Sequence, residues 1–160
     1  MNIKYIAATV CKYVALILVL VLIIGLASNG RVSSASVDEV AAQVLAVTDT
    51  SPMKQADDQM IRRLYGLDPA DYDGIVLYCP SSNMGAEEVL IVRMADTDQQ
   101  NTVKAAIEAR LASQLSGFEG YGADQTAMLN DSIIEISGNY ALFVSAANPA
   151  EIRQAFRDAL

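Results

Sequence analysis

An uncharged run of eighteen residues, YVALILVLVLIIGLASNG, divides this chain of 160 residues into two unequal parts. The run lies between Lys12 and Arg31. As an α-helix it would span about 27 Å, close to the hydrocarbon core of a bilayer. It therefore predicts a transmembrane anchor over residues 13–30. Residues 1–12 precede this anchor, residues 31–36 form a short polar stalk, and residues 37–160 have the length of one folded domain.

Charges on the two sides of the anchor predict its orientation. Lys4 and Lys12 precede the run, whereas Arg31 is followed by Asp38 and Glu39. The positive-inside rule then places the N-terminus in the cytoplasm and the domain of residues 37–160 outside the membrane. A cleaved signal peptide, with a cleavage site near residues 25–27, is the alternative and would give a secreted protein. The length of the run favours a retained single-pass anchor.

Beyond the stalk, hydrophobic periodicity predicts helices and strands in a regular order. Helices are expected over 37–48, over a segment spanning 53–64, from about 96 to 115, over 123–130 and from 148 to the C-terminus. Strands rich in branched residues are expected over 74–79, 88–94, 132–137 and 140–146. Ser36 and Glu39 have the spacing of a capping box at the first helix, and Gly66 is expected to end the second.

These elements predict an α+β fold. After the helical lead-in, the chain twice reads strand, strand, helix, and Gly138-Asn139 indicates a hairpin between the last two strands. Two such units give a four-stranded, mainly antiparallel sheet with helices packed on one face. In the helix from 96 to 115, the apolar ladder consists of Val103, Ile107, Leu111 and Leu115.

The composition excludes several chemistries. The chain has no histidine, which excludes Ser-His-Asp and Cys-His nucleophiles, the metalloprotease helix and Cys/His zinc sites. Residues 31–160 hold nine Lys/Arg and nineteen Asp/Glu, a net charge of −10, so no nucleic-acid partner is expected. The aspartates between Asp68 and Gly74 do not fit the register of a calcium loop and are interpreted as turn and cap residues. The sequence therefore predicts no catalytic residue, no metal ligand and no cofactor.

Three side chains that could carry chemistry lie at or near the ends of the first two predicted strands. Cys79 is interpreted as a small hydrophobic core residue, because no neighbouring cation is visible that would lower its pKa. A reactive or intermolecularly bonded thiol is the alternative. Glu87 and Glu88 are interpreted as solvated charges at the start of the second strand, where they would point to opposite faces.

Two loops are the candidate partner-binding surface. The connection over 80–86 offers Ser81, Ser82, Asn83 and Met84, and the glycine-rich segment GFEGYG offers Phe118 and Tyr121. Loops carry binding residues more often than the framework does. The two aromatic side chains could instead serve as lids over the core.

The order of these elements resembles the bacterial envelope family known as domain of unknown function 4358, over roughly residues 37–158. The resemblance implies a small extracytoplasmic domain behind a membrane or lipid anchor, mostly in Gram-positive bacteria. This chain departs from the lipoprotein-like members because it lacks a lipid-accepting cysteine after the apolar run. The resemblance brings no catalytic residues. It is carried by Leu64-Tyr65-Gly66-Leu67, Asp71-Tyr72, Ile75-Val76-Leu77-Tyr78, Met84, Ala86, Glu87, Val89-Leu90-Ile91-Val92, Val103, Ile107, Arg110, Tyr121, the segment from Gly138 to Val144, Ile152 and Phe156.

Three functions are consistent with the sequence. The first is an interaction module anchored in the bacterial cell membrane through residues 13–30, which binds an envelope protein or wall polymer through its loops. The second is a small-ligand sensor, and the third is an enzyme that acts on a glycan with carboxylates alone. The sequence leaves the ligand, the partner and the oligomeric state open.

Overall fold

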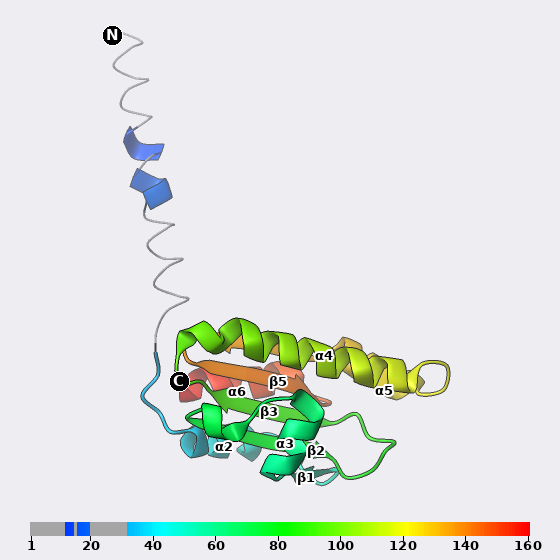
Figure 1. The fold of residues 1–160 in the computed structure, drawn as a ribbon. Helices are drawn as coiled ribbons and strands as arrows, with labels where there is room; N and C mark the ends of the chain where they lie inside the picture. Colours follow the sequence, from blue (N-terminus) through cyan, green and yellow to red (C-terminus); the bar gives the residue numbers. More distant parts are fainter. Residues whose placement is uncertain (1–11, 15, 20–31) are drawn as a thin grey trace, which may run out of the picture. The chain divides into compact units, whose positions relative to one another are not determined.

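The computed structural model describes residues 12–14, 16–19 and 32–160 (Figure 1). Residues 12–14 and 16–19 are helical and belong to a separate unit from the compact domain of Val32–Leu160. Most of the predicted anchor, 13–30, lies outside the described residues. Within the described residues, no helix has both the length and the apolar character needed to cross a membrane.

The domain alternates helices and strands in the α+β order that the sequence predicts. The helices are α2 (Val37–Ala46), α3 (Asp58–Tyr65), α4 (Gln100–Phe118), α5 (Ala123–Asn130) and α6 (Pro149–Ala159). The strands are β1 (Met53–Gln55), β2 (Gly74–Pro80), β3 (Glu88–Arg93), β4 (Ile133–Ser137) and β5 (Tyr140–Ser145). Two 3-10 turns, η1 (Pro69–Asp71) and η2 (Thr97–Gln99), precede β2 and α4.

The sheet has five strands in the order β1-β2-β3-β5-β4, and every neighbouring pair is antiparallel. The prediction of four strands is wrong because residues 53–55, expected in a helix, form the edge strand β1. Met53 pairs with Pro80 at the far end of β2, a long-range contact that a three-residue segment does not signal. Helix α3 begins later, where the Asp57 carboxylate accepts a hydrogen bond of 2.8 Å from Met60 N.

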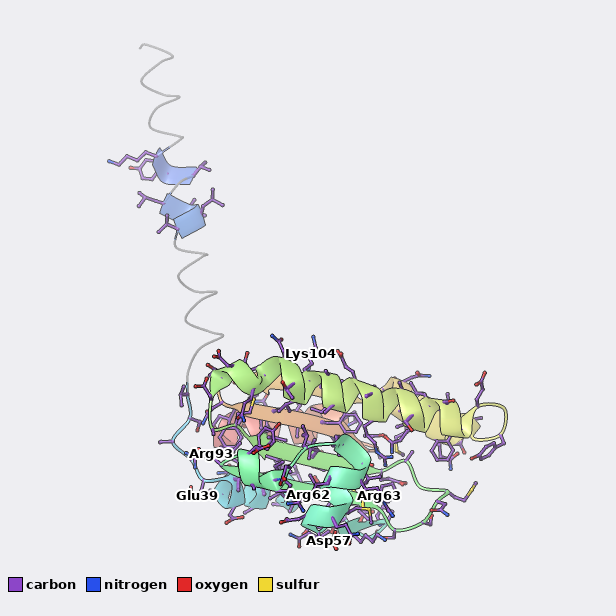
Figure 2. The ribbon with its side chains drawn as sticks, viewed as in Figure 1. Glu39, Asp57, Arg62, Arg63, Arg93 and Lys104 are labelled. Carbon is purple, nitrogen blue, oxygen red and sulfur yellow. The ribbon has the colours of Figure 1, made fainter. Side chains whose placement is uncertain are left out.

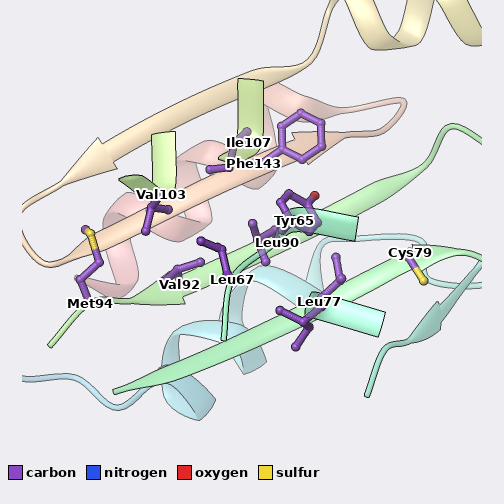
Figure 3. Packing of buried hydrophobic residues seen from close by; sticks show 12 residues of the cluster. Tyr65, Leu67, Leu77, Cys79, Leu90, Val92, Met94, Val103, Ile107 and Phe143 are labelled. Carbon is purple, nitrogen blue, oxygen red and sulfur yellow. The ribbon is translucent and has the colours of Figure 1, made fainter. Parts of the chain in front are cut away.

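Helices cover both faces of the sheet, so the prediction that they pack on one face is also wrong. On one face, α3 and α4 cover a core that includes Leu90 and Phe143, and both helices lie in front of the sheet in Figure 1 (core in Figure 3). On the other face, α2 and α6 cover Ile91 and Leu142. The apolar runs of β3 and β5 are almost continuous, and a strand buried on both faces requires such a run.

The face of α4 that packs against the sheet differs from the face predicted from the apolar ladder. A strict four-residue spacing drifts around a helix of 3.6 residues per turn, so the ladder leaves the inner face after Ile107. Leu111 and Leu115 are only partly buried. The buried positions of α4 are Val103, Ile107, Gln114 and Phe118. The inner face of the helix therefore includes a polar position in its second half.

Two helix boundaries follow the predicted local chemistry. At α2, the Ser36 hydroxyl accepts a hydrogen bond from Glu39 N and the Glu39 carboxylate accepts one from Ser36 N, which completes the capping box. At the end of α3, Gly66 has a φ of 67°, a left-handed conformation that favours glycine. The two predictions are confirmed.

The burial of both sheet faces can be tested at two adjacent core residues of β5, Leu142 and Phe143. Leu142→Ala and Phe143→Ala should each lower the free energy of unfolding, by about 2–5 and 3–5 kcal/mol respectively, because both side chains are fully buried on opposite faces. Chemical denaturation measures both losses. Lys104→Ala, on the exposed side of α4, is the control and should change stability by less than about 0.5 kcal/mol. A near-neutral Leu142→Ala would contradict a sheet covered on both faces.

Candidate functional site

A pocket of about 330 Å³ lies at one end of the domain, between the β2–β3 connection, α3 and the second half of α4. The β2–β3 connection and the turn between α4 and α5 both lie at the right-hand end of the domain in Figure 1. Five of the six loop residues selected from the sequence line this pocket, namely Ser81, Ser82, Asn83, Phe118 and Tyr121. The structure therefore brings the two predicted loops together around one cavity.

Met84 is the loop residue that does not line the pocket. Its side chain is 57 % exposed, and its carbonyl oxygen accepts a hydrogen bond of 3.3 Å from Gln125 Nε2 of α5. The backbone of Met84 therefore connects the β2–β3 loop to α5 through a hydrogen bond, and its side chain is exposed to solvent.

A small apolar cluster fixes the two loops. Ala86, Phe118 and Leu129 pack together, with Leu115 of α4 at their edge. Gly122 allows the close packing of the turn, because a Cβ there would lie 2.6 Å from the Phe118 ring. Phe118 thus acts both as a lid over this cluster and as a wall of the pocket.

Three cations line the pocket: Lys54 of β1, Arg63 of α3 and Arg110 of α4. Lys54 reaches it because it pairs with Cys79 across β1 and β2, so the two side chains lie on the same face of the sheet. Arg63 projects from α3 beside Arg62 (Figure 2). None of the residues that line the pocket is an aspartate or a glutamate.

Beneath the pocket, Glu88 is fully buried and forms the centre of a polar network. Its two carboxylate oxygens accept hydrogen bonds from Arg110 Nε and Nη2, at 3.1 and 2.6 Å. Glu88 also accepts a hydrogen bond from the Tyr65 hydroxyl and one of 3.2 Å from Gln114 Nε2. The interpretation of Glu88 as a solvated charge is therefore wrong.

Strand alternation explains where Glu88 points. It lies two residues before Leu90, so its side chain faces α3 and α4, as the Leu90 side chain does. Glu87, one residue earlier, is partly buried, and its carboxylate accepts a hydrogen bond of 3.0 Å from Ala86 N. Ser145 pairs with Glu88 across β3 and β5, and its buried hydroxyl has no hydrogen-bond partner among the described residues.

The network shifts the pKa of two of its members. Burial and the neighbouring Glu88 carboxylate raise the pKa of Tyr65 well above its ordinary value. Burial alone would lower the pKa of Arg110, but its hydrogen bonds to Glu88 and the attraction of that carboxylate together outweigh burial and raise it. At neutral pH the Tyr65 phenol is therefore neutral and the Arg110 guanidinium is charged, and both donate hydrogen bonds to Glu88.

Gln114 of the network has a buried acceptor without a partner. Its Nε2 donates a hydrogen bond of 3.2 Å to Glu88, so Oε1 of the same amide points elsewhere. Gln114 is only 7 % exposed, and its Oε1 has no hydrogen-bond partner within the described residues. The oxygen has almost no exposed surface, so it is an unsatisfied acceptor inside the protein and not a group open to the pocket.

Cys79 lies at the edge of the core and also lines the pocket. Burial, followed by the nearby Glu88 carboxylate, raises the pKa of its thiol. A raised pKa keeps the sulfur protonated at neutral pH and makes it a poor nucleophile. Its burial in the core agrees with the interpretation of Cys79 as a small hydrophobic residue.

The sequence analysis missed the three cations of this site, Lys54, Arg63 and Arg110, and the buried polar residues Tyr65, Glu88 and Gln114 beneath them. A usable signal was the helical spacing of Ile107, Arg110 and Gln114, which places two polar groups on the inner side of α4. Across the described residues, no three Cys, Asp or Glu side chains come together as a metal site would require. What the pocket offers is positive charge, hydrogen-bonding groups and an apolar wall.

A family model described as a domain of unknown function (DUF4358) matches residues 46–146, more than half of the chain. The match confirms the resemblance found in the sequence, and it includes the whole sheet, α3, α4, α5 and the pocket. Helices α2 and α6, which cover the other face, lie almost entirely outside it. No curated protein and no solved structure matches the chain.

Removing the partner of the buried carboxylate should destabilise the domain strongly. Arg110→Ala leaves Glu88 as an unpaired buried charge, and we expect a loss of about 3–5 kcal/mol in the free energy of unfolding. The control is Arg157→Ala, which breaks a pair with Glu135 at the same distance of 2.6 Å but with the arginine half exposed. That change should cost at most about 1 kcal/mol in urea denaturation. Equal losses would show that the Glu88 pair is not buried.

The raised pKa of Tyr65 predicts a pH dependence. The folded state holds the phenol proton more tightly than the unfolded state, so this stabilisation is complete below pH about 10 and is lost as the pH rises further. Tyr65→Phe should cost about 1.5–3 kcal/mol at pH 7, because it removes a hydrogen bond to a charged group. The variant should also lose stability less steeply than the native protein above pH 10. If the free energy of unfolding fell equally steeply with pH in the variant and in the native protein above pH 10, the raised pKa of Tyr65 would be contradicted.

Proposed function

We propose that this chain, which belongs to the family of the domain of unknown function 4358, is a binding module of the bacterial envelope that holds an anionic ligand group in its pocket. The observation that carries the proposal is the charge of the lining: Lys54, Arg63 and Arg110 line the pocket without any carboxylate. Glu88 beneath them balances one of these three charges. The pocket is therefore positive in a domain that is otherwise strongly acidic.

The positive charge of the pocket contrasts with the rest of the domain surface. Four of the five other cations in residues 32–160 are paired with carboxylates, Arg153 being the exception: Arg62 with Asp68, Arg93 with Asp73, Lys104 with Glu108 and Arg157 with Glu135. Neither Lys54 nor Arg63 forms a salt bridge in the part of the chain that the structure describes. A partly enclosed cavity with unpaired cations concentrates anions from solution.

The other lining groups suit a ligand of limited size. A volume of about 330 Å³ is at the lower end of the range of small-molecule sites. Ser81, Ser82 and Asn83 offer polar contacts at the rim, while Leu64 and Phe118 offer an apolar wall. These features favour recognition of a small molecule, or of one chemical group of a wall component, over contact with a flat protein surface.

The pocket gives no support to the hypothesis of a glycan hydrolase. That chemistry needs two carboxyl groups about 5–10 Å apart on either side of the substrate. No carboxylate lines the cavity, and Glu88 is held in an ion pair by Arg110. Binding is therefore the function that the lining residues favour.

The envelope location rests on the sequence. Residues 13–30 have the length and composition of a membrane anchor, and the lysines before them favour a cytoplasmic N-terminus. With this topology the pocket faces the outside of the cell, where wall polymers and exported molecules are its accessible ligands.

A panel of anions tests the proposal. The full chain in detergent should gain thermal stability with carboxylated or phosphorylated compounds, but not with neutral analogues of similar size, because only the anions neutralise the cations of the lining. Arg63→Gln should weaken the effect roughly tenfold in apparent affinity, corresponding to about 1.4 kcal/mol.

Arg62→Gln is the matched control, because it removes the same charge from the neighbouring residue of α3, which does not line the pocket. It should leave the effect of the anions unchanged. Equal stabilisation by neutral and anionic compounds, or equal losses in the two variants, would contradict an anion-binding pocket.

A further inference from the structure

We infer that β4, one of the two edge strands of the sheet, pairs with β4 of a second copy of this chain and forms a two-fold symmetric dimer. None of the residues that line the anion pocket belongs to β4, so this surface is separate from the proposed ligand site. Three features of β4 favour the pairing: its open backbone groups, its apolar side chains and the charges beside it.

The backbone of β4 has hydrogen-bonding groups on its open side. Its only strand neighbour among the described residues is β5. Successive residues of a strand point their N–H and C=O groups to opposite sides. The Asn139 carbonyl accepts a hydrogen bond of 2.7 Å from the residue after β3, so Tyr140 points the other way and pairs with Ser137 of β4. By the same alternation, the backbone groups of Ile134 and Ile136 point away from β5.

The two edges of the sheet differ in their protection against pairing. The edge strand β1 is three residues long, follows Pro52 and carries Lys54, and all three features discourage the addition of a strand. In contrast, β4 has the sequence IIEIS, without proline or lysine. Its only charged residue, Glu135, points to the α6 side, where Arg157 binds it at 2.6 Å. β4 is therefore the edge that is open to another strand.

Helix α4 leaves the open side of β4 uncovered. The side chains of Ile134 and Ile136 are only partly buried against the core. An added strand would supply partners for the open backbone groups and an apolar side chain beside these two. The space for that side chain is a hollow of about 330 Å³, lined by Gln100, Asn101, Lys104, Ile134 and Ile136.

The charges beside β4 favour a second copy as the occupant. Helix α6 begins shortly after β5 and ends near the β4–β5 turn, because Ser33 bonds both that turn and the residue after α6. It therefore runs in the same direction as β4. Arg153 lies one helical turn before Arg157, and so beside Ile133, two residues before Glu135. Arg153 forms no salt bridge within the described residues.

These charges select one register for the dimer. With the two-fold axis at Ile134, the two copies of Ile134 pair directly, and each Glu135 lies opposite Ile133 of the other copy. Each Glu135 then has Arg157 of its own chain on one side and Arg153 of the second copy on the other. An axis at Glu135 would instead place the two carboxylates directly opposite each other. The strand and its flanking charges are thus complementary to themselves.

Disulfide cross-linking of the full chain in detergent tests the pairing and its register. In a Cys11→Ser background, Ile134→Cys should form an intermolecular disulfide under mild oxidation, because paired Cα atoms lie about 5.5 Å apart. Ile136→Cys is the matched control on the same face of β4. In this register its two copies lie about 13 Å apart along the strands, too far for a disulfide. Gels run without reductant measure the cross-linked fraction.

The oligomeric state of the uncross-linked chain tests the charges. Analytical ultracentrifugation in density-matched detergent should show a dimer. Arg153→Glu should raise its dissociation constant roughly tenfold, because the change replaces attraction by repulsion at two symmetric contacts. Arg62→Glu makes the same charge change on α3, away from β4, and should leave the dissociation constant unchanged.

A dimer that cross-links at residue 134 and not at residue 136 supports the inference. A monomeric native chain would overturn it, as would a dimer insensitive to Arg153→Glu or cross-linking that is equal or absent in both cysteine variants. If Ile134→Cys does not fold, amide hydrogen exchange of the native chain decides the question. The amides of Ile134 and Ile136 should then exchange as slowly as that of Glu135, which β5 already pairs, and fast exchange would overturn the inference. None of these outcomes bears on the anion pocket.

Discussion

The buried contact between Glu88 and Arg110 is the interaction on which the site depends. Removing a carboxylate from water costs several kcal/mol, and this cost is offset only where the charge is paired and its lone pairs are satisfied. Arg110, Tyr65 and Gln114 do this for Glu88, with hydrogen bonds from α3 and α4 to the first residue of β3. Arg110 and Gln114 also line the pocket, so the network that satisfies Glu88 forms part of the pocket wall. The same residues therefore stabilise the fold and determine the chemistry of the site.

The covered sheet provides the rigid frame for that network. Strands β3 and β5 are buried on both faces, so the end of β3 that carries Glu88 cannot reach solvent. The edge strand β1 adds Lys54 beside the end of β2, and the cluster of Ala86, Phe118 and Leu129 holds the two loops against the cavity. Binding groups from β1, α3 and α4 thus converge at one end of a domain whose opposite face is closed by α2 and α6.

Local patterns in the sequence predicted much of this arrangement. The capping box at Ser36, the glycine that ends α3 and four of the strands follow from short-range chemistry. The two loops were also identified, because they are polar, rich in glycine and placed between regular elements. The charged floor was not predicted, since Glu88 is separated by more than twenty residues from each of its partners. Whether a glutamate at the start of a strand is solvated or buried depends on such distant partners. β1 was missed for the same reason, because its pairing with β2 defines it.

The central claim is that Arg110 and Arg63 together receive an anionic group while Arg110 stays bonded to Glu88. Side-chain nuclear magnetic resonance of ¹⁵N-labelled arginine, followed during titration with the carboxylated compound that gives the largest thermal stabilisation, tests it most directly. The guanidinium signals of Arg110 and Arg63 should shift together and saturate at one ligand per chain, while the signal of Arg157, on the other side of the domain in α6, should not move. Shifts of equal size at Arg157, or no shift at Arg110, would contradict the account.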